Sequence, residues 1–169
     1  STLWAASSIS LLTHEVATVT DGGVMKLYKN GALVKTKNDG AAPNVLTRTK
    51  NYLGQEHGGN KNFHGVMKNV KMYNYLLGQS DITTLSNDHS YTIMPTTSPT
   101  TSPTISPNFW LLMENAEDSG GGGLDGTLNN FSGTFGFLAS QGGLYFDGVD
   151  DYVDLPDITI GGAISISLW

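Results

Sequence analysis

Apolar and polar side chains alternate at period two along several stretches of the first half of the chain. The clearest are Glu15–Thr20, Gly23–Thr36 and Gly65–Asn74. This alternation predicts strands that bury one face each. The second stretch contains Asn30-Gly31 between two apolar-alternating runs, and a type I′ turn favours this pair because it needs positive φ at both central positions. A hairpin is therefore expected around Asn30-Gly31.

The end of the chain carries the same alternation, over Ala163–Trp169. Three apolar residues of this run share one face, which predicts another half-buried strand. They are Ile164, Ile166 and Leu168.

One short helix is expected after the strands of the first half, over Gly78–Leu85. Gly78 suits the N-cap position, and Asp81 would face the positive end of the helix dipole.

A Ser/Thr/Pro-rich segment, residues 91–108, separates the two halves. Ser-Pro recurs in it with a four-residue period from Ser98 to Pro107. Proline at this density removes ladder hydrogen bonds and favours extended polyproline II, so we expect a linker that spans roughly 40 Å over Pro95–Pro107. Such tracts suit an O-glycosylated stalk, and a plain spacer is the alternative.

Composition narrows the class of protein. The chain of 169 residues has 38% hydrophobic and 14% charged residues, 21 glycines and no cysteine, as expected of a turn-rich globular protein without disulfides. The net charge of −6 gives no electrostatic reason to bind nucleic acid. No apolar run approaches the length of about 20 residues that spans a membrane, so we expect no direct membrane insertion.

Motifs in the second half match the beginning of a known kind of domain. "FDGVDDYVDLP" (residues 146–156) followed by "ISISLW" (residues 164–169) resembles the amino-terminal half of laminin G-like, or concanavalin A-like, jelly rolls. "LDGTLNN" at residues 124–130 is similar to the step that the same family places before that strand.

Motifs in the first half resemble the end of the same domain. "THEVATVTDGGVMKLYKNGALV" (residues 13–34) is similar to the family's His-Val-Ala strand and Tyr-x-Asn-Gly hairpin, and "FHGVMKNVKMYNYLLGQSDITTL" (residues 63–85) to its closing strand and short helix. Several middle strands of the family have no counterpart here, which would leave open sheet edges.

This order of motifs implies an all-β, antiparallel jelly-roll β-sandwich present in pieces. Residues 1–90 would be the C-terminal half of one module, 91–108 the linker, and 109–169 the N-terminal half of the next. The chain would then be one period of a tandem array of neighbouring laminin G-like modules. The alternative is that the two halves pack on each other as a circularly permuted sandwich.

An acidic cluster in the second half is the candidate metal site. Closely spaced carboxylates around a glycine turn suit Ca²⁺, which takes six to eight oxygen ligands. The resemblance supports calcium, since many members of the family carry it. In the alternative, Asp147 and Asp150 hold the turn backbone while Asp154 and Asp157 are solvated. The metal ligands expected are Asp147, Asp150 and Asp151, with Asp125 as a further one.

A polar, glycine-rich loop in the first half, Gly54–Gly65, is the candidate ligand-binding segment. Its amide, imidazole and carboxylate groups suit sugar hydroxyls, and loops on a rigid scaffold commonly carry binding. An ordinary solvated loop is the alternative. The candidate ligand-binding residues are Gln55, Glu56, His57, Asn60, Asn62 and His64.

Catalysis is not expected, although the resemblance extends to glucanases. Those enzymes place carboxyl groups about 5 Å apart on one strand as Glu-x-Asp-x-x-Glu, and the chain has no such spacing. We therefore expect a non-catalytic extracellular or cell-surface module that binds glycans or glycoproteins in a tandem array, with calcium as an aid. The alternatives are a structural spacer in an adhesion array and an accessory module of a secreted carbohydrate-active enzyme.

Overall fold

A computed structural model describes residues 13–87, 109–111, 123–131, 136–138 and 142–169. This part of the chain consists of antiparallel strands and one helix, α1 (Gln79–Asn87), as the sequence predicts for an all-β protein. None of its helices is long and apolar enough to cross a membrane. The strands are β1 (Glu15–Val19), β2 (Met25–Lys29), β3 (Ala32–Lys37), β4 (Leu46–Arg48), β5 (Asn51–Leu53), β6 (His64–Met67), β7 (Val70–Tyr73), β8 (Phe109–Leu111), β9 (Thr127–Asn129), β10 (Gly136–Leu138), β11 (Gly143–Asp147), β12 (Tyr152–Leu155), β13 (Ile158–Ile160) and β14 (Ile164–Leu168).

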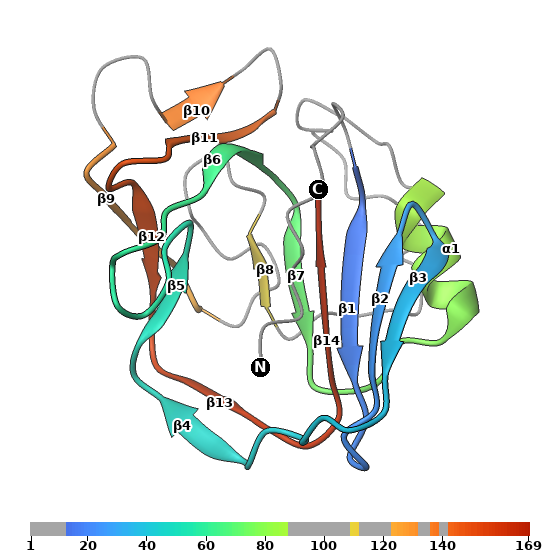
Figure 1. Ribbon diagram of the computed structural model, residues 1–169. Helices are drawn as coiled ribbons and strands as arrows, with labels where there is room; N and C mark the ends of the chain where they lie inside the picture. Colours follow the sequence, from blue (N-terminus) through green and yellow to red (C-terminus); the bar gives the residue numbers. More distant parts are fainter. Residues whose placement is uncertain (1–12, 88–108, 112–122, 132–135, 139–141) are drawn as a thin grey trace.

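The largest sheet has six strands in the order β3-β2-β1-β14-β7-β8. Figure 1 shows it beside a second layer, with α1 packed on its outer side. The second layer is built from three small sheets, β10-β11-β6, β5-β12-β9 and β13-β4. The described residues therefore form an antiparallel β-sandwich, in agreement with the predicted fold class.

Strands from the two halves of the chain are mixed in all four of these sheets. In the six-stranded sheet, β14 from the end of the chain lies between β1 and β7 from its beginning. This pairing is expected if the two halves pack on each other as a circularly permuted sandwich, which is the alternative given above. The assignment of residues 1–90 and 109–169 to two modules of a longer array concerns the parent protein and stays a prediction. The predicted linker, residues 91–108, lies outside the described residues.

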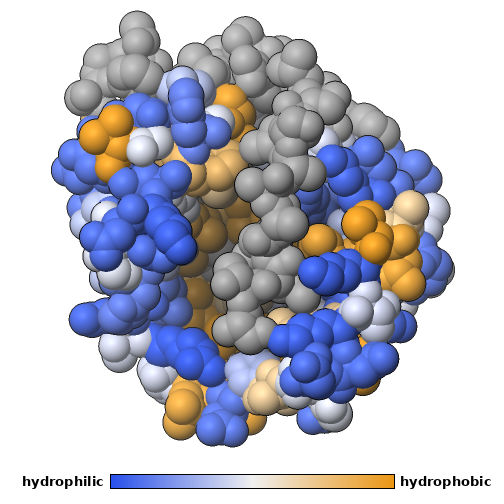
Figure 2. Space-filling view, viewed as in Figure 1, coloured by the Kyte–Doolittle hydropathy of each residue, from blue (hydrophilic) through white to orange (hydrophobic). Residues whose placement is uncertain are grey.

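The main core fills the space between the two layers, where Figure 2 shows apolar residues. Strands of both layers contribute to it, and partly buried residues such as Ile166 and Leu168 of β14 pack against it. At about 1.5–3 kcal/mol for each large apolar side chain removed from water, this cluster stabilises the layer contact. Its buried members are Val70, Met72, Leu111, Leu144, Phe146, Val153, Leu155 and Ile158.

A second core lies between the six-stranded sheet and α1. Ile82 and Leu85 are the buried apolar residues of the helix, and they pack on Val16, Tyr28 and Tyr73 of the sheet. The helix begins as the sequence predicts: the Gly78 N–H donates to Asp81 Oδ2 at 2.9 Å, which places a carboxylate at the positive end of the helix.

β14 is buried on both faces, whereas the sequence predicts burial of its isoleucine face. Ser165 and Ser167 are 0% and 2% exposed because they face the second core, beneath α1. Their hydroxyls have partners there. Ser165 Oγ accepts from the Leu77 N–H and donates to the Tyr75 carbonyl, both at 2.9 Å, and Ser167 Oγ lies 2.8 Å from His14 Nε2. Two-sided burial identifies β14 as the central strand of the sheet.

The turn at Asn30-Gly31 is confirmed, with φ of 50° and 80°. The run Gly65–Asn74, however, does not form the single strand expected from its alternation. Asn69 adopts a φ of 55°, which ends the ladder, and the chain passes from β6 in one layer to β7 in the other. At this break Lys68 and Trp169 exchange two backbone hydrogen bonds of 2.9 Å.

Removing the Ser165 hydroxyl tests the role of β14. Ser165→Ala leaves the buried Leu77 N–H without its acceptor, so we expect the free energy of unfolding to fall by about 1–3 kcal/mol. Urea denaturation measures the change. Ser80→Ala, on the exposed first turn of α1, is the matched control and should stay within about 0.5 kcal/mol of the parent. Equal stability of Ser165→Ala and the parent would contradict the role of the Ser165 hydroxyl as the acceptor for the buried Leu77 N–H.

Candidate functional site

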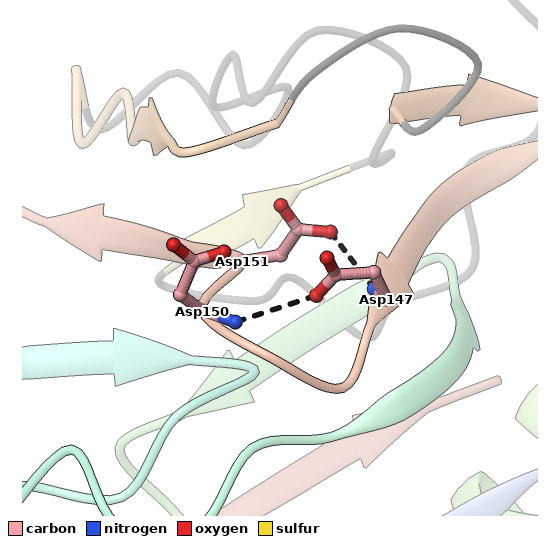
Figure 3. A group of neighbouring side chains, drawn as sticks. All are labelled: Asp147, Asp150 and Asp151. Carbon is pink, nitrogen blue, oxygen red and sulfur yellow. Dashed lines mark hydrogen bonds between the residues drawn. The ribbon is translucent and has the colours of Figure 1, made fainter.

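The acidic turn, Asp147–Asp151, joins β11 to β12. Asp147 Oδ1 accepts from the Val149 N–H at 2.7 Å and from the Asp150 N–H at 3.3 Å. Gly148 supplies the positive φ of 80° that the reversal needs. The Asp147 carboxylate therefore holds the backbone of its own turn. This is the role predicted from the sequence for Asp147 as the alternative to binding a metal. Figure 3 shows the three carboxylates around this turn.

Asp151 anchors the turn from beneath. Its side chain is 1% exposed, and its Oδ2 accepts from the Asp147 N–H at 2.8 Å. Asp150, in contrast, is exposed. Asp147, Asp150 and Asp151 each offer one oxygen, and these three oxygens lie within 4.8 Å of one another. The turn thus gathers three carboxylates at one point, and one of them is buried.

The carboxyl groups of the turn have pKa values shifted in opposite directions. The pKa of Asp147 is lowered, because backbone N–H groups stabilise its carboxylate. The Val149 N–H contributes most, and the N–H groups of Asp150 and Asp151 contribute less. Burial raises the pKa of Asp151, and repulsion from Asp147 and Asp150 acts in the same direction. Asp147, which holds the turn, is therefore stabilised as an anion. The ionised form of the buried Asp151 is disfavoured.

The structure shortens the predicted loop Gly54–Gly65, because β6 begins at His64. The remaining residues, 54–63, form the polar loop, which is closed by its own backbone. Gln55 and Asn62 form an isolated bridge, and the Phe63 N–H donates to the Gly54 carbonyl at 2.7 Å. The Glu56 N–H donates to the Lys61 carbonyl at 3.0 Å. This pairing leaves residues 57–61 exposed at the tip of the loop.

The polar loop and the acidic turn lie against each other, although the sequence separates them widely. Asn62 Nδ2 donates to the Val149 carbonyl, across 87 positions. Next to this contact β6 pairs with β11, with His64 opposite Asp147. A Cβ added at Gly148 would come within 2.7 Å of the His64 Cβ, so only glycine allows this approach. We call the joined segments, residues 55–64 and 145–151, the composite rim.

The structure divides the predicted ligand-binding residues into two groups. Asn62 and His64 already have partners within the rim, since His64 Nε2 lies 2.7 Å from the Tyr145 hydroxyl. The other four are not tied to the acidic turn by a side-chain hydrogen bond in the described structure. Of these, His57 and Asn60 are exposed and Gln55 and Glu56 are half-buried. Glu56 is 4.0 Å from the Lys61 ammonium.

Asp125, the fourth predicted metal ligand, is exposed and lies outside the group formed by the other three. From the same segment, Asn130 contacts the turn, since its Nδ2 donates to the Asp150 carbonyl at 3.0 Å.

Sequence reasoning did not identify Tyr145 as part of the rim, or Asn130 as a residue that contacts it. For Tyr145 a signal was available, because period two in "GLYFD" places Tyr145 and Asp147 on one face and the buried Leu144 and Phe146 on the other. For Asn130 there was no such signal, since its contact with Asp150 depends on the pairing of β9 with β12.

Comparison with protein families matches residues 5–83 to the laminin G-like model of the concanavalin A-like lectin/glucanases superfamily. The resemblance is confirmed over these residues, a little under half of the chain, and they include the polar loop. The acidic turn lies outside the matched range. Comparison with curated proteins and with solved structures found no match.

The opposite pKa shifts predict opposite effects of two substitutions on stability. Because the pKa of Asp151 is raised by folding, its contribution is favourable near pH 4 and is lost as the pH rises through the folded pKa. Asp151→Asn retains an acceptor for the Asp147 N–H, so its free energy of unfolding should fall less than that of the parent between about pH 4 and 7. Urea denaturation across this range, without added calcium, measures the effect.

Asp147→Asn is the comparison of opposite sign. The pKa of Asp147 is lowered by folding, so the contribution of its carboxylate is present above about pH 4 and is lost as the pH falls through the folded value. This variant should be less stable than the parent at neutral pH. Parallel pH profiles for both variants and the parent would contradict the electrostatics of the turn.

Proposed function

We propose that this chain is a non-catalytic binding module that recognises glycans through the composite rim, with calcium held at the acidic turn. The matched superfamily supports a binding role, since laminin G-like domains are generally binding modules. The observation that carries the proposal is the contact of Asn62 with the Val149 carbonyl, because it unites the two polar segments into a single surface.

The chemistry of the rim suits a ligand rich in hydroxyl groups. His57, Asn60 and Glu56 offer both donors and acceptors beside the acceptors of Asp147 and Asp150. A sugar ring presents hydroxyls, which donate and accept together. Without bound calcium the carboxylates would repel an anionic ligand, so the calcium-free rim favours neutral or cationic glycans.

The residues at the turn fit a calcium ion in part. Their three mutually close carboxylate oxygens are the hard ligands that calcium prefers, and calcium takes six to eight oxygens at irregular angles. Asp147, Asp150 and Asp151 would hold the ion, and water or ligand hydroxyls would complete its coordination. Calcium bound there would offset the repulsion among these carboxylates and would attract sugar oxygens.

The same carboxylates do not support hydrolysis. Their oxygens lie within 4.8 Å of one another, and the pKa values of Asp147 and Asp151 are displaced in opposite senses, as in a glycosidase pair. Asp151, however, is 1% exposed and accepts the Asp147 N–H. A glycosidic oxygen cannot reach it without unfolding the turn, so the pair serves the structure of the turn and cation binding.

An extracellular or cell-surface location, with tandem copies of the module on Ser/Thr/Pro stalks, is part of this proposal. The composition of the linker supports it. Several weak sites on one chain would bind with high avidity, because the second contact is intramolecular. A glycan screen distinguishes this function from that of a spacer in an adhesion array, which would bind no glycan.

Asn60→Ala tests glycan recognition at the rim. Loss of one ligand hydrogen bond of about 1.4 kcal/mol should weaken binding about tenfold. Isothermal titration with a glycan selected from an array measures the dissociation constant. Asn38→Ala, at an exposed asparagine outside the rim, is the matched control and should bind as the parent does. If both variants bind equally, the glycan is held elsewhere; if no glycan in the array binds, the spacer role is favoured.

Asp150→Asn tests calcium at the turn. Calcium at about 100-fold excess over its dissociation constant should raise the free energy of unfolding of the parent by about 2.7 kcal/mol. The exposed Asp150 side chain makes no hydrogen bond to the turn in the described structure, so its substitution should abolish the calcium effect and leave the turn folded. The apo protein should become slightly more stable, because the repulsion between Asp150 and Asp151 is relieved. Asp157→Asn, outside the group, should respond as the parent does. Thermal unfolding in calcium and in chelator measures this, and a parent protein that is insensitive to calcium would contradict the site.

A further inference from the structure

The outer edge of the six-stranded sheet is formed by β3, and it has unusual exposure. Within the described residues β3 pairs with β2 only, and its first five residues are exposed. Leu33 and Val34 are 51% and 59% exposed. Figure 2 shows a hydrophobic patch on the side where Figure 1 places β3, bordered by hydrophilic residues. An exposed edge with apolar side chains is a template for a further strand.

The hairpin that carries this edge is basic, although the chain as a whole is acidic. Residues 25–37 hold four of the chain's nine Lys and Arg residues and no Asp or Glu, against a net charge of −6. Lys35 lies opposite Leu27, and Lys37 lies opposite Met25. Because cross-strand partners share a face, the two lysines project from the same face of the edge strand. The four are Lys26, Lys29, Lys35 and Lys37.

A bulge shapes this edge. The register between β2 and β3 shifts at Leu27/Tyr28, so Val34 has no opposite residue in β2. A bulge of this kind bends the strand and increases its local twist. Leu33, opposite Tyr28, lies on the face that carries α1, whereas Lys35 and Lys37 lie on the opposite face. The edge therefore presents an apolar contact on one face and cations on the other.

These charges argue against pairing with a second copy of the same chain. Two β3 strands in antiparallel register would bring Lys35 and Lys37 of both copies together on one face, and like charges across a ladder are destabilising. Lysines on an edge strand commonly prevent self-association for this reason. An acidic strand would be attracted instead, because its carboxylates would pair with Lys35 and lie next to Lys37, whose ammonium is already 3.9 Å from Asp39 Oδ1.

From this geometry we propose that β3 is a docking edge for an extended acidic segment of another protein, which adds to the six-stranded sheet as a further strand. Backbone hydrogen bonds to the outer edge of β3 provide the affinity, and alternate side chains provide the selectivity. Carboxylates at every second position of the partner pair with Lys35 and Lys37. An apolar residue on the other face of the partner covers Leu33.

The test uses the intact protein and two synthetic probes. The first is a labelled peptide of about eight residues that alternates Glu with Val. The second has the same sequence with methyl groups on alternate backbone nitrogens, which keeps the charge but removes ladder hydrogen bonds. Fluorescence anisotropy measures binding, and amide hydrogen exchange reports protection at β3. We expect the first peptide to bind with protection of the β3 amides, and the methylated peptide to bind at least about tenfold more weakly.

Charge reversal provides the second arm. The double variant with Lys35→Glu and Lys37→Glu should bind the acidic peptide about tenfold more weakly than the parent. Lys50→Glu, which reverses an exposed lysine outside the hairpin, is the matched control and should bind within about twofold of the parent. Circular dichroism of each variant confirms that its fold is retained, and the methylated peptide gives a result even if the double variant does not fold.

Three results would overturn the proposal. Equal binding of both peptides would show that no strand is added. Binding of a heparin fragment as tight as that of the peptide, without protection of β3, would indicate a general polyanion surface. Protection of β3 that rises with protein concentration in the absence of peptide, together with a dimer in sedimentation, would identify a second copy of the chain as the occupant. None of these results depends on glycan binding at the composite rim.

Discussion

The insertion of β14 between β1 and β7 is the contact on which the remaining architecture depends. Without β14 the described strands of the large sheet would separate into β3-β2-β1 and β7-β8, and each group would gain an open edge. β14 can take this central place because it satisfies both sides of the sheet. Ile166 and Leu168 pack against the main core, and the hydroxyls of Ser165 and Ser167 have polar partners beneath α1.

The position of the composite rim follows from the same contact. β7 is held against β14, and only Lys68 and Asn69 separate β7 from β6, so β6 enters the second layer at a fixed point. There it pairs with β11, which ends at Asp147. The polar loop precedes β6 and the acidic turn follows β11, so antiparallel pairing brings both to the same end. A contact in one layer thereby determines which polar groups meet in the other.

The sequence alone predicts the local features of this fold better than its long-range ones. Period-two alternation locates β1, β2, β3 and β14, and Asn30-Gly31 locates the hairpin, because these signals depend on neighbouring residues. The break at Asn69 was missed because the alternation continues across it while the strand changes layers. Likewise, both segments of the rim were recognised separately, but their contact was not, since the bond from Asn62 to Val149 spans 87 positions.

The composite rim and the β3 edge have opposite electrostatic character, because the rim contains the acidic turn and the edge belongs to the basic hairpin. This allows the two surfaces to act independently. The acidic turn belongs to the second layer, and the basic hairpin, residues 25–37, forms the far edge of the six-stranded sheet. Charges separated by more than the Debye length, about 8 Å at physiological ionic strength, are largely screened. A ligand bound at one surface therefore changes the affinity of the other little through charge. A chain with such a division could hold the proposed glycan and the proposed protein partner at the same time, because the lysines of the basic edge attract the acidic partner there.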